Sequence, residues 1–132
     1  MTIQRLTEFG KFVRIARLEA GKQLKEMADA AGISSAYLSS IEMGRKEVSE
    51  KIVNAISNYL QFDEDKSNEL WVAANISNGK IKLDIEGQTN EGARVATMFA
   101  RHFADLTEEE MEKISDVLKN NSNGLKKEPI NM

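Results

Sequence analysis

Cysteine is absent from this chain of 132 residues. Its absence excludes disulfides, thiolate metal sites and cysteine nucleophiles, and it fits a reducing compartment. Long apolar runs are absent too, so no segment of the sequence is predicted to span a membrane. The first five residues, Met-Thr-Ile-Gln-Arg, lack the apolar core of a signal peptide. We therefore expect a cytoplasmic protein.

Side chains suited to catalysis are scarce. His102 is the only histidine, and beside Phe99 and Phe103 we expect it to be a partly buried structural residue. Three glutamates from Glu108 onward begin a predicted helix, where carboxylates favour the positive end of the helix dipole. The sequence has no glycine-rich phosphate loop and no metal-ligand spacing. We expect no enzyme activity, no cofactor and no metal.

The charge of the chain is uneven. Residues 1–60 carry nine basic and seven acidic side chains, whereas residues 61–132 carry nine basic and fourteen acidic ones, for a net charge of −3. A mildly basic front half and an acidic back half fit a DNA-binding module joined to a module that does not bind DNA.

Apolar residues at helical spacing predict five short helices in the first 76 residues, and so an all-α fold. The first helix is expected to bury Phe9, Phe12, Val13, Ala16 and Leu18. The candidate N-caps are Thr7, Ser34 or Ser35, Ser49, and Asp63 or Asp65, and the candidate helix ends are Gly21, Gly32 and Gly44.

A different pattern follows. Asn78 and Gly79 indicate a turn, and alternating apolar residues over 81–85 predict a short extended segment. Two helices should come next, one over about 91–104 and one that begins at Thr107 with a capping box to Glu110. We expect a DNA-binding domain over 1–77, a helical dimerisation or partner-binding region over 78–120, and a flexible tail over 121–132.

Residues 23–42 have the features of a helix-turn-helix. Ala28 is small where two helix backbones must approach, and Gly32 follows the first helix where the chain needs a positive φ angle. Ile33 should fill the angle between the two helices. The second helix would then project from the body of the domain and fit the major groove of B-DNA.

Residues 9–60 resemble the Cro/CI-repressor (XRE) helix-turn-helix family. The resemblance rests on Leu-Lys-Glu-Met-Ala from Leu24, on Gly-Ile-Ser from Gly32, and on Tyr-Leu-Ser-Ser-Ile-Glu-Met-Gly-Arg from Tyr37. It implies a lambda-repressor-like domain in which Arg17 pairs with Glu42. Two positions depart from the family: Gln23-Leu24 replaces the usual Thr-Gln, and Val48-Ser49 replaces a common proline.

Contacts to DNA are expected from the projecting helix and the loop that follows it. Base edges should be read by Ser35, Ala36, Ser39 and Ser40, which discriminate weakly between bases. Ser34 should cap the helix and could hold a phosphate, and Gln23 could replace the family's polar contact. Tyr37 could stack on the DNA backbone or pack against the next helix. Arg45 and Lys46 are expected to bind phosphates, whereas Lys11 and Arg14 are expected to lie on a solvated helix face.

One helix-turn-helix covers only half of an operator, so we expect a homodimer on two half-sites of double-stranded DNA. The tentative dimer contacts are Met98, Phe99, Phe103 and Met111; alternatively, these residues pack on Trp71 and the fifth helix. The leading function is a transcriptional repressor. The alternative is an antitoxin that neutralises a toxin partner and represses the shared operon.

Overall fold

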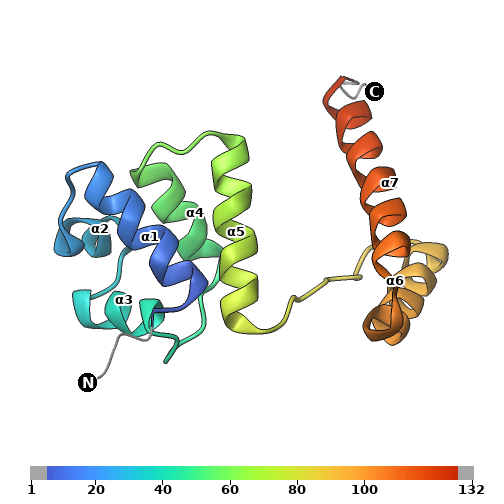
Figure 1. Cartoon of the computed structure of the whole chain (residues 1–132), viewed down its shortest axis with the longest axis horizontal. Helices are drawn as coiled ribbons and strands as arrows, with labels where there is room; N and C mark the ends of the chain where they lie inside the picture. The colour runs from blue at the N-terminus through green and yellow to red at the C-terminus, as the bar shows by residue number, and fades with distance from the viewer. Residues whose placement is uncertain (1–5, 128–132) are drawn as a thin grey trace. The chain divides into compact units, whose positions relative to one another are not determined.

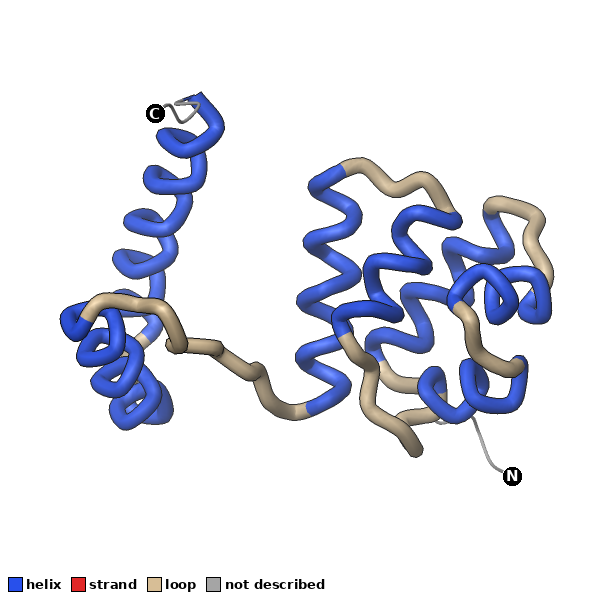
Figure 2. The backbone as a smooth tube through the Cα atoms, turned by 180° about the vertical axis from the view of Figure 1, so that it is seen from behind, coloured by secondary structure: helices blue, strands red, loops and turns tan. Residues whose placement is uncertain are grey.

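The structure is a computed structural model that describes the backbone of residues 6–127 and the side chains of residues 6–121. Within that range the fold is all-α, as predicted, with seven α-helices, one 3-10 turn and no strand (Figures 1 and 2). The chain divides into two compact units, and the boundary between them along the sequence falls between Lys82 and Leu83.

The first unit contains five helices: α1 (Glu8–Glu19), α2 (Leu24–Ala31), α3 (Ser35–Glu42), α4 (Glu50–Tyr59) and α5 (Glu64–Asn78). Most of them begin where the sequence predicts an N-cap. The side chains of Thr7, Ser34, Ser49 and Asp63 each accept a hydrogen bond from a backbone N–H in the first turn of the following helix. Such caps satisfy donors that a helix start leaves without a partner.

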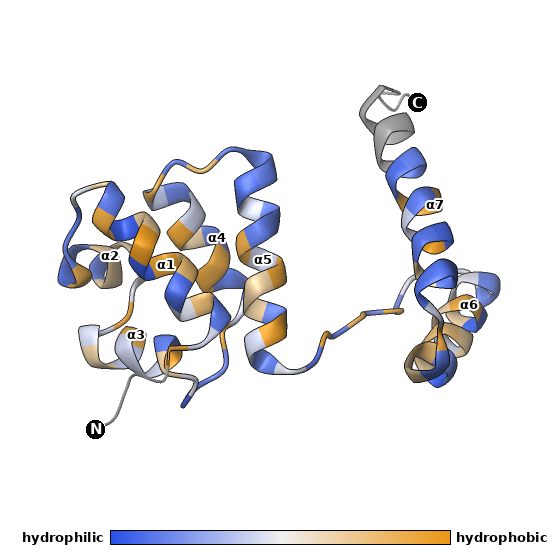
Figure 3. Ribbon diagram, viewed as in Figure 1, coloured by the Kyte–Doolittle hydropathy of each residue, from blue (hydrophilic) through white to orange (hydrophobic). Residues whose placement is uncertain are grey.

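The core of the first unit lies where these helices meet, and their apolar sides turn inward (Figure 3). Its fully buried members include Phe9, Met27, Leu38, Ile41, Ile56 and Leu70. α1 packs against α3 and α5, and α2 packs against α3 and α4. One prediction for α1 is wrong, because Leu18 is 64% exposed. The side of α1 that carries Phe9, Val13 and Ala16 faces the core, and Leu18 does not lie on that side.

Residues 80–85 form no strand, so the alternating apolar residues in this part of the described chain do not indicate a sheet. Every residue from 80 to 89 is exposed. The hydrogen bonds recorded within this stretch are local, such as the one from the Gln88 N–H to the Ile85 carbonyl at 3.0 Å. The stretch is a linker that contributes nothing to a core.

The second unit contains α6 (Asn90–His102), the 3-10 turn η1 (Phe103–Asp105) and α7 (Glu108–Lys127). The predicted capping box is present: the Thr107 N–H donates to Glu110 Oε1 at 3.0 Å, and the Glu110 N–H donates to Thr107 Oγ1 at 3.1 Å. Two predictions are wrong here. His102 is exposed rather than partly buried, because none of the described side chains of its unit covers that face of α6. α7 also continues to Lys127, since extending a helix is easier than starting one. Residues 128–132 of the expected tail lie outside the described residues.

Candidate nucleic-acid interface

The crossing of α2 and α3 is built as the sequence predicts. Gly32 adopts a φ of +74°, a left-handed conformation that favours glycine, and the chain turns sharply there. The Ile33 N–H donates to the Ala28 carbonyl at 3.0 Å, which closes the end of α2. Ala28 is fully buried, and its small side chain lets the two helices approach. Residues 23–42 therefore form a helix-turn-helix.

One side of α3 is buried and the other is open. Leu38, Ile41 and Glu42 are buried, whereas Ala36 is exposed and Ser35, Ser39 and Ser40 are half-buried. Tyr37 is 37% exposed, so its ring is neither free in solvent nor enclosed in the core. Base contacts from Ser35, Ala36, Ser39 and Ser40 stay predictions that this placement permits.

The starts of the two helices hold the remaining predicted contacts of the turn. Ser34 Oγ accepts from the Tyr37 N–H at 3.0 Å, which confirms its capping role. The Gln23 N–H donates to Glu26 Oε1 at 3.0 Å and begins α2, while Gln23 itself is exposed. Its side chain is therefore open to solvent beside the helix-turn-helix, where a phosphate contact stays a prediction.

The loop after α3 presents two cations. Arg45 and Lys46 are exposed, and neither forms an ion pair with another residue in the described part of the chain. The neighbouring acid is neutralised, because Lys80 Nζ lies 3.0 Å from Glu47 Oε2. An anion that approaches this loop therefore meets positive charge.

Asn78, at the end of α5, holds this loop in place. Its Oδ1 accepts from the Val48 N–H at 2.9 Å, and its Nδ2 donates to the Val48 carbonyl at 2.9 Å. Val48 is buried, so these two bonds satisfy backbone groups that water reaches poorly. The sequence indicated only a turn at Asn78. An amide side chain at a helix end could have suggested a hydrogen-bonding role for Asn78, but local spacing cannot identify a partner thirty residues earlier in the chain.

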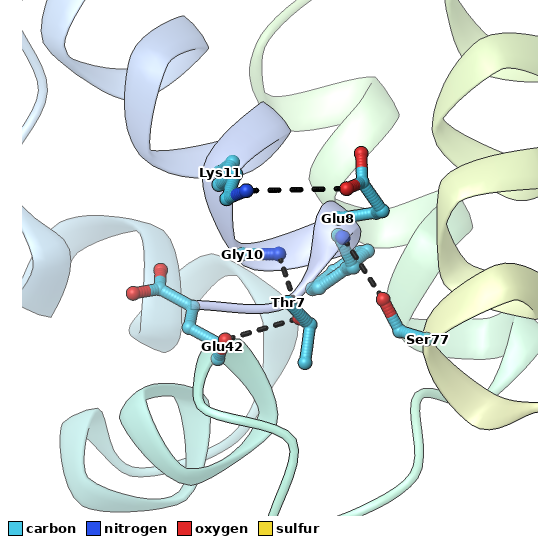
Figure 4. A network of polar contacts seen from close by, with 7 residues as sticks. Thr7, Glu8, Gly10, Lys11, Glu42 and Ser77 are labelled. Atoms are coloured by element: carbon cyan, nitrogen blue, oxygen red, sulfur yellow. Dashed lines mark hydrogen bonds and ion pairs between the residues drawn. The ribbon is translucent and has the colours of Figure 1, made fainter. Parts of the chain in front are cut away.

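A polar network fixes the C-terminal end of α3 against the start of α1 (Figure 4). The backbone N–H and the hydroxyl of Thr7 both donate to the Glu42 carbonyl, each at 3.0 Å. Gly10 lies so close that a Cβ there would overlap this carbonyl oxygen. The start of α1 is held in turn by α5, since the Phe9 N–H donates to Ser77 Oγ at 3.0 Å. This network sets the position of α3 in its unit.

The ion pair of Glu42 differs from the expected one. Arg14, predicted to be solvated, places Nη2 3.5 Å from Glu42 Oε1. Arg17 is buried near this carboxylate, but its Nε has no hydrogen-bond partner among the described residues, and neither has Glu42 Oε2. Both arginines of α1 act on the charge of the glutamate, but only Arg14 forms an ion pair with it among the described residues. Lys11 does lie on the exposed face of α1, 4.0 Å from Glu8.

Burial changes the acidity of this carboxyl. Desolvation raises the pKa of Glu42 above its usual range, and the charges of Arg14 and Arg17 oppose part of that rise. The folded protein therefore keeps the proton to a higher pH than the unfolded chain does. This preference stabilises the fold fully below the unfolded pKa, and the contribution is lost as pH rises through the folded pKa.

Glu42→Gln tests this direction. The free energy of unfolding of the wild type, relative to the variant, should be greatest in acid and should fall as the buffer approaches neutrality. Urea titrations at several pH values would measure it through the fluorescence of Trp71, the only tryptophan, which lies half-buried in α5. The other titrating groups are shared by both proteins and cancel in the difference. A difference that grew with pH would mean that the two arginines outweigh burial.

The fold and the crossing of α2 and α3 define the class of this domain, and comparison with known proteins agrees. A family profile described as "Helix-turn-helix domain" matches residues 8–70. Residues 8–70 are thus a helix-turn-helix domain of the XRE-like kind, which confirms the resemblance seen in the sequence.

Two curated relatives are similar to part of this domain. Both are named "Transcriptional regulator ClgR", from Mycobacterium tuberculosis strains CDC 1551 / Oshkosh and ATCC 25618 / H37Rv. Each is 46% identical over 53 residues, which are 40% of this chain and 47% of the relative. The chain thus spans about half the length of the relatives that it matches.

The described residues contain neither a membrane-spanning helix nor a metal-binding cluster. None of the helices there combines the length and the apolar character that crossing a bilayer requires. No group of histidine and acidic side chains in the same residues is arranged to hold a metal ion.

Proposed function

We propose that this chain is a sequence-specific regulator of the Cro/CI type that represses transcription as a dimer on double-stranded DNA. The observation that carries the proposal is the open side of α3. This helix is capped at its start by Ser34 and bonded at its end to Thr7. The loop after it carries two cations, Arg45 and Lys46, which form no ion pair in the described residues. A helix of this kind fits the major groove, and the cations would meet the phosphates that flank it.

The proposed roles divide between reading and positioning. Ser35, Ala36, Ser39 and Ser40 would face base edges, where serine discriminates weakly and alanine can only touch a thymine methyl group. Ser34, Gln23 and Tyr37 would contact the backbone beside them. Because this reading set is modest, part of the specificity would come from phosphate positioning and from the shape of the DNA.

Arg45→Glu is expected to weaken binding to all DNA sequences by about tenfold or more and to reduce the salt dependence of binding. Gel-shift or fluorescence-anisotropy titrations on operator and unrelated DNA at several salt concentrations would measure both effects. The melting temperature should barely change, because Arg45 is exposed. Lys66→Glu makes a comparable change of charge in the first turn of α5, away from α3 in sequence and outside the second unit, and serves as the control. Unchanged affinity in Arg45→Glu would remove the phosphate role.

An antitoxin is the second candidate, and the exposed apolar residues of α6 and α7 favour it. Met98, Phe99, Phe103 and Met111 are 40–55% exposed, so a toxin could cover them as well as a second copy could. Sedimentation of the purified chain separates the two. A monomer with these faces open would support the antitoxin, whereas a dimer that buries them would leave a toxin no apolar surface there.

A further inference from the structure

The second unit has helices but no core. No side chain described between residues 83 and 121 is buried. Leu106 and Ile114 are half-buried. Seven other large apolar residues in the helical part of this unit are 40–61% exposed: Val95, Met98, Phe99, Phe103, Met111, Val117 and Leu118. Phe99 and Phe103 contact each other with ring centroids 5.4 Å apart, and both remain open to solvent.

Helices of this length need packing in order to form. α6 has 13 residues, and isolated helices shorter than about 12–15 residues are marginal in water. Caps at Thr89 and Thr107 help each helix to begin, but a cap contributes only about 1 kcal/mol. The burial of an apolar face that stabilises most helices in proteins is missing from this unit.

The apolar residues form one stripe on each helix. On α6 they recur at Val95 and Phe99 and continue to Phe103 in η1, and on α7 they recur at Met111, Ile114 and Leu118. Spacings of three and four residues bring them to one side of a helix. Figure 3 shows orange segments on both helices of this unit. Two stripes in one chain, neither covered, are the pattern of half a helical bundle.

The exposed area is large enough for a stable contact. Large apolar side chains bury roughly 150–250 Å² each, so seven at about half exposure offer about 600 Å² per copy. Two copies would then bury about 1,200 Å², which lies at the lower limit of specific, stable interfaces.

A second copy of this chain is the occupant that the charges favour. α6 carries one acidic and two basic residues, whereas α7 carries five acidic and four basic ones. Packing α6 of one copy against α7 of the other would bring opposite net charges together twice, by symmetry. The single helix-turn-helix also calls for two copies on two half-sites; in this respect the inference rests on the proposed function.

We infer that α6 and α7 fold only in a dimer, in which the two apolar stripes of each copy are covered by those of the other. Dimerisation and folding of the second unit are then one event, while the first unit folds independently around its own core. The protein at low concentration is a folded helix-turn-helix domain with an unfolded C-terminal segment.

Dilution of the full chain tests this, because two probes report on different units. Far-UV circular dichroism detects every helix, whereas Trp71 reports on the first unit alone. Dilution through the monomer–dimer transition, followed by sedimentation, should lower the helical signal while Trp71 fluorescence stays constant. A monomer that keeps its full helical signal would overturn the inference.

Substitution provides the second test. Phe99→Glu with Phe103→Glu should weaken dimerisation at least tenfold and remove the helical signal of α6 and α7, with the unfolding midpoint seen by Trp71 unchanged. Thr97→Glu, about 200° around α6 from Phe99, is the matched control and should stay dimeric. A double variant that dimerises like the wild type would exclude this interface.

The two proposals fail in different ways. A chain that folds on dimerisation but binds no DNA would contradict the proposed function and support this inference. A chain that binds operator DNA as a dimer, but whose separated monomer is already fully helical, would do the reverse. Arg45→Glu serves as the reference, because it should lose DNA affinity while remaining a dimer.

Discussion

Gly10→Ala should lower the free energy of unfolding by about 3 kcal/mol, at the upper end of the usual cost of overpacking. The added Cβ would overlap the Glu42 carbonyl oxygen, and the nearby atoms are backbone, which cannot rotate away. α1 and α3 must separate, and the two hydrogen bonds from Thr7 to that carbonyl must lengthen or break. Tight operator binding should be lost with the position of α3. Urea unfolding followed by Trp71 fluorescence and an operator titration would measure the two effects.

Gly92→Ala makes the same change where there is room. Gly92 lies in the first turn of α6, and the atoms nearest to an added Cβ belong mainly to the flexible side chain of Gln88, at 3.1 Å and 3.4 Å. Alanine is also the better helix former, so the helical signal of α6, followed by far-UV circular dichroism, should be unchanged or slightly higher. If Gly10→Ala were as harmless as Gly92→Ala, the close approach of α1 and α3 would not exist.

Asn78→Ala should cost about 2 kcal/mol of stability, because it leaves both backbone groups of the buried Val48 without their partner. The loop that carries Arg45 and Lys46 would lose its attachment to α5. Affinity for DNA should therefore fall for every sequence, since phosphate contacts carry no sequence information. The ratio of operator to unrelated-DNA affinity should change less than either affinity.

Two further variants make this prediction sharp. Asn68→Ala removes an exposed asparagine from the same helix and should have little effect. Asn78→Asp keeps the acceptor for the Val48 N–H but loses the donor to the Val48 carbonyl, so it too should lower the free energy of unfolding. Wild-type stability in Asn78→Ala would show that the bonds to Val48 do not anchor the loop.

Local rules in the sequence predicted most of the first unit. The caps at Thr7, Ser34 and Ser49 and the left-handed Gly32 depend on residues within four positions of each other, so they can be read along the chain. The helix-turn-helix was predicted for the same reason. Its match to a family profile confirms the class, while the individual DNA contacts stay predictions.

Features that depend on how helices cross were missed. Gly10 appears in the sequence as a glycine inside a helix, and only its approach to Glu42 explains it. Arg14 and Arg17 lie three residues apart on α1, and the family resemblance favoured Arg17 as the partner of Glu42, whereas the ion pair in the structure is formed by Arg14. Leu18 and His102 were assigned to packed faces because helical periodicity shows that a face exists, not what covers it.

The length of the exposed linker bears on the spacing of DNA half-sites that the proposed dimer could bind. At about 3.3 Å per residue, residues 80–89 can extend to about 33 Å, close to the 34 Å or so that separates half-sites one DNA turn apart. The first unit is closed at Asn78 by its own bonds to Val48, so stretching this linker does not disturb α3. In the proposed dimer, half-sites whose spacing differs by a few base pairs could then be bound by the same protein, and the linker rather than the recognition surface would set the tolerated spacing.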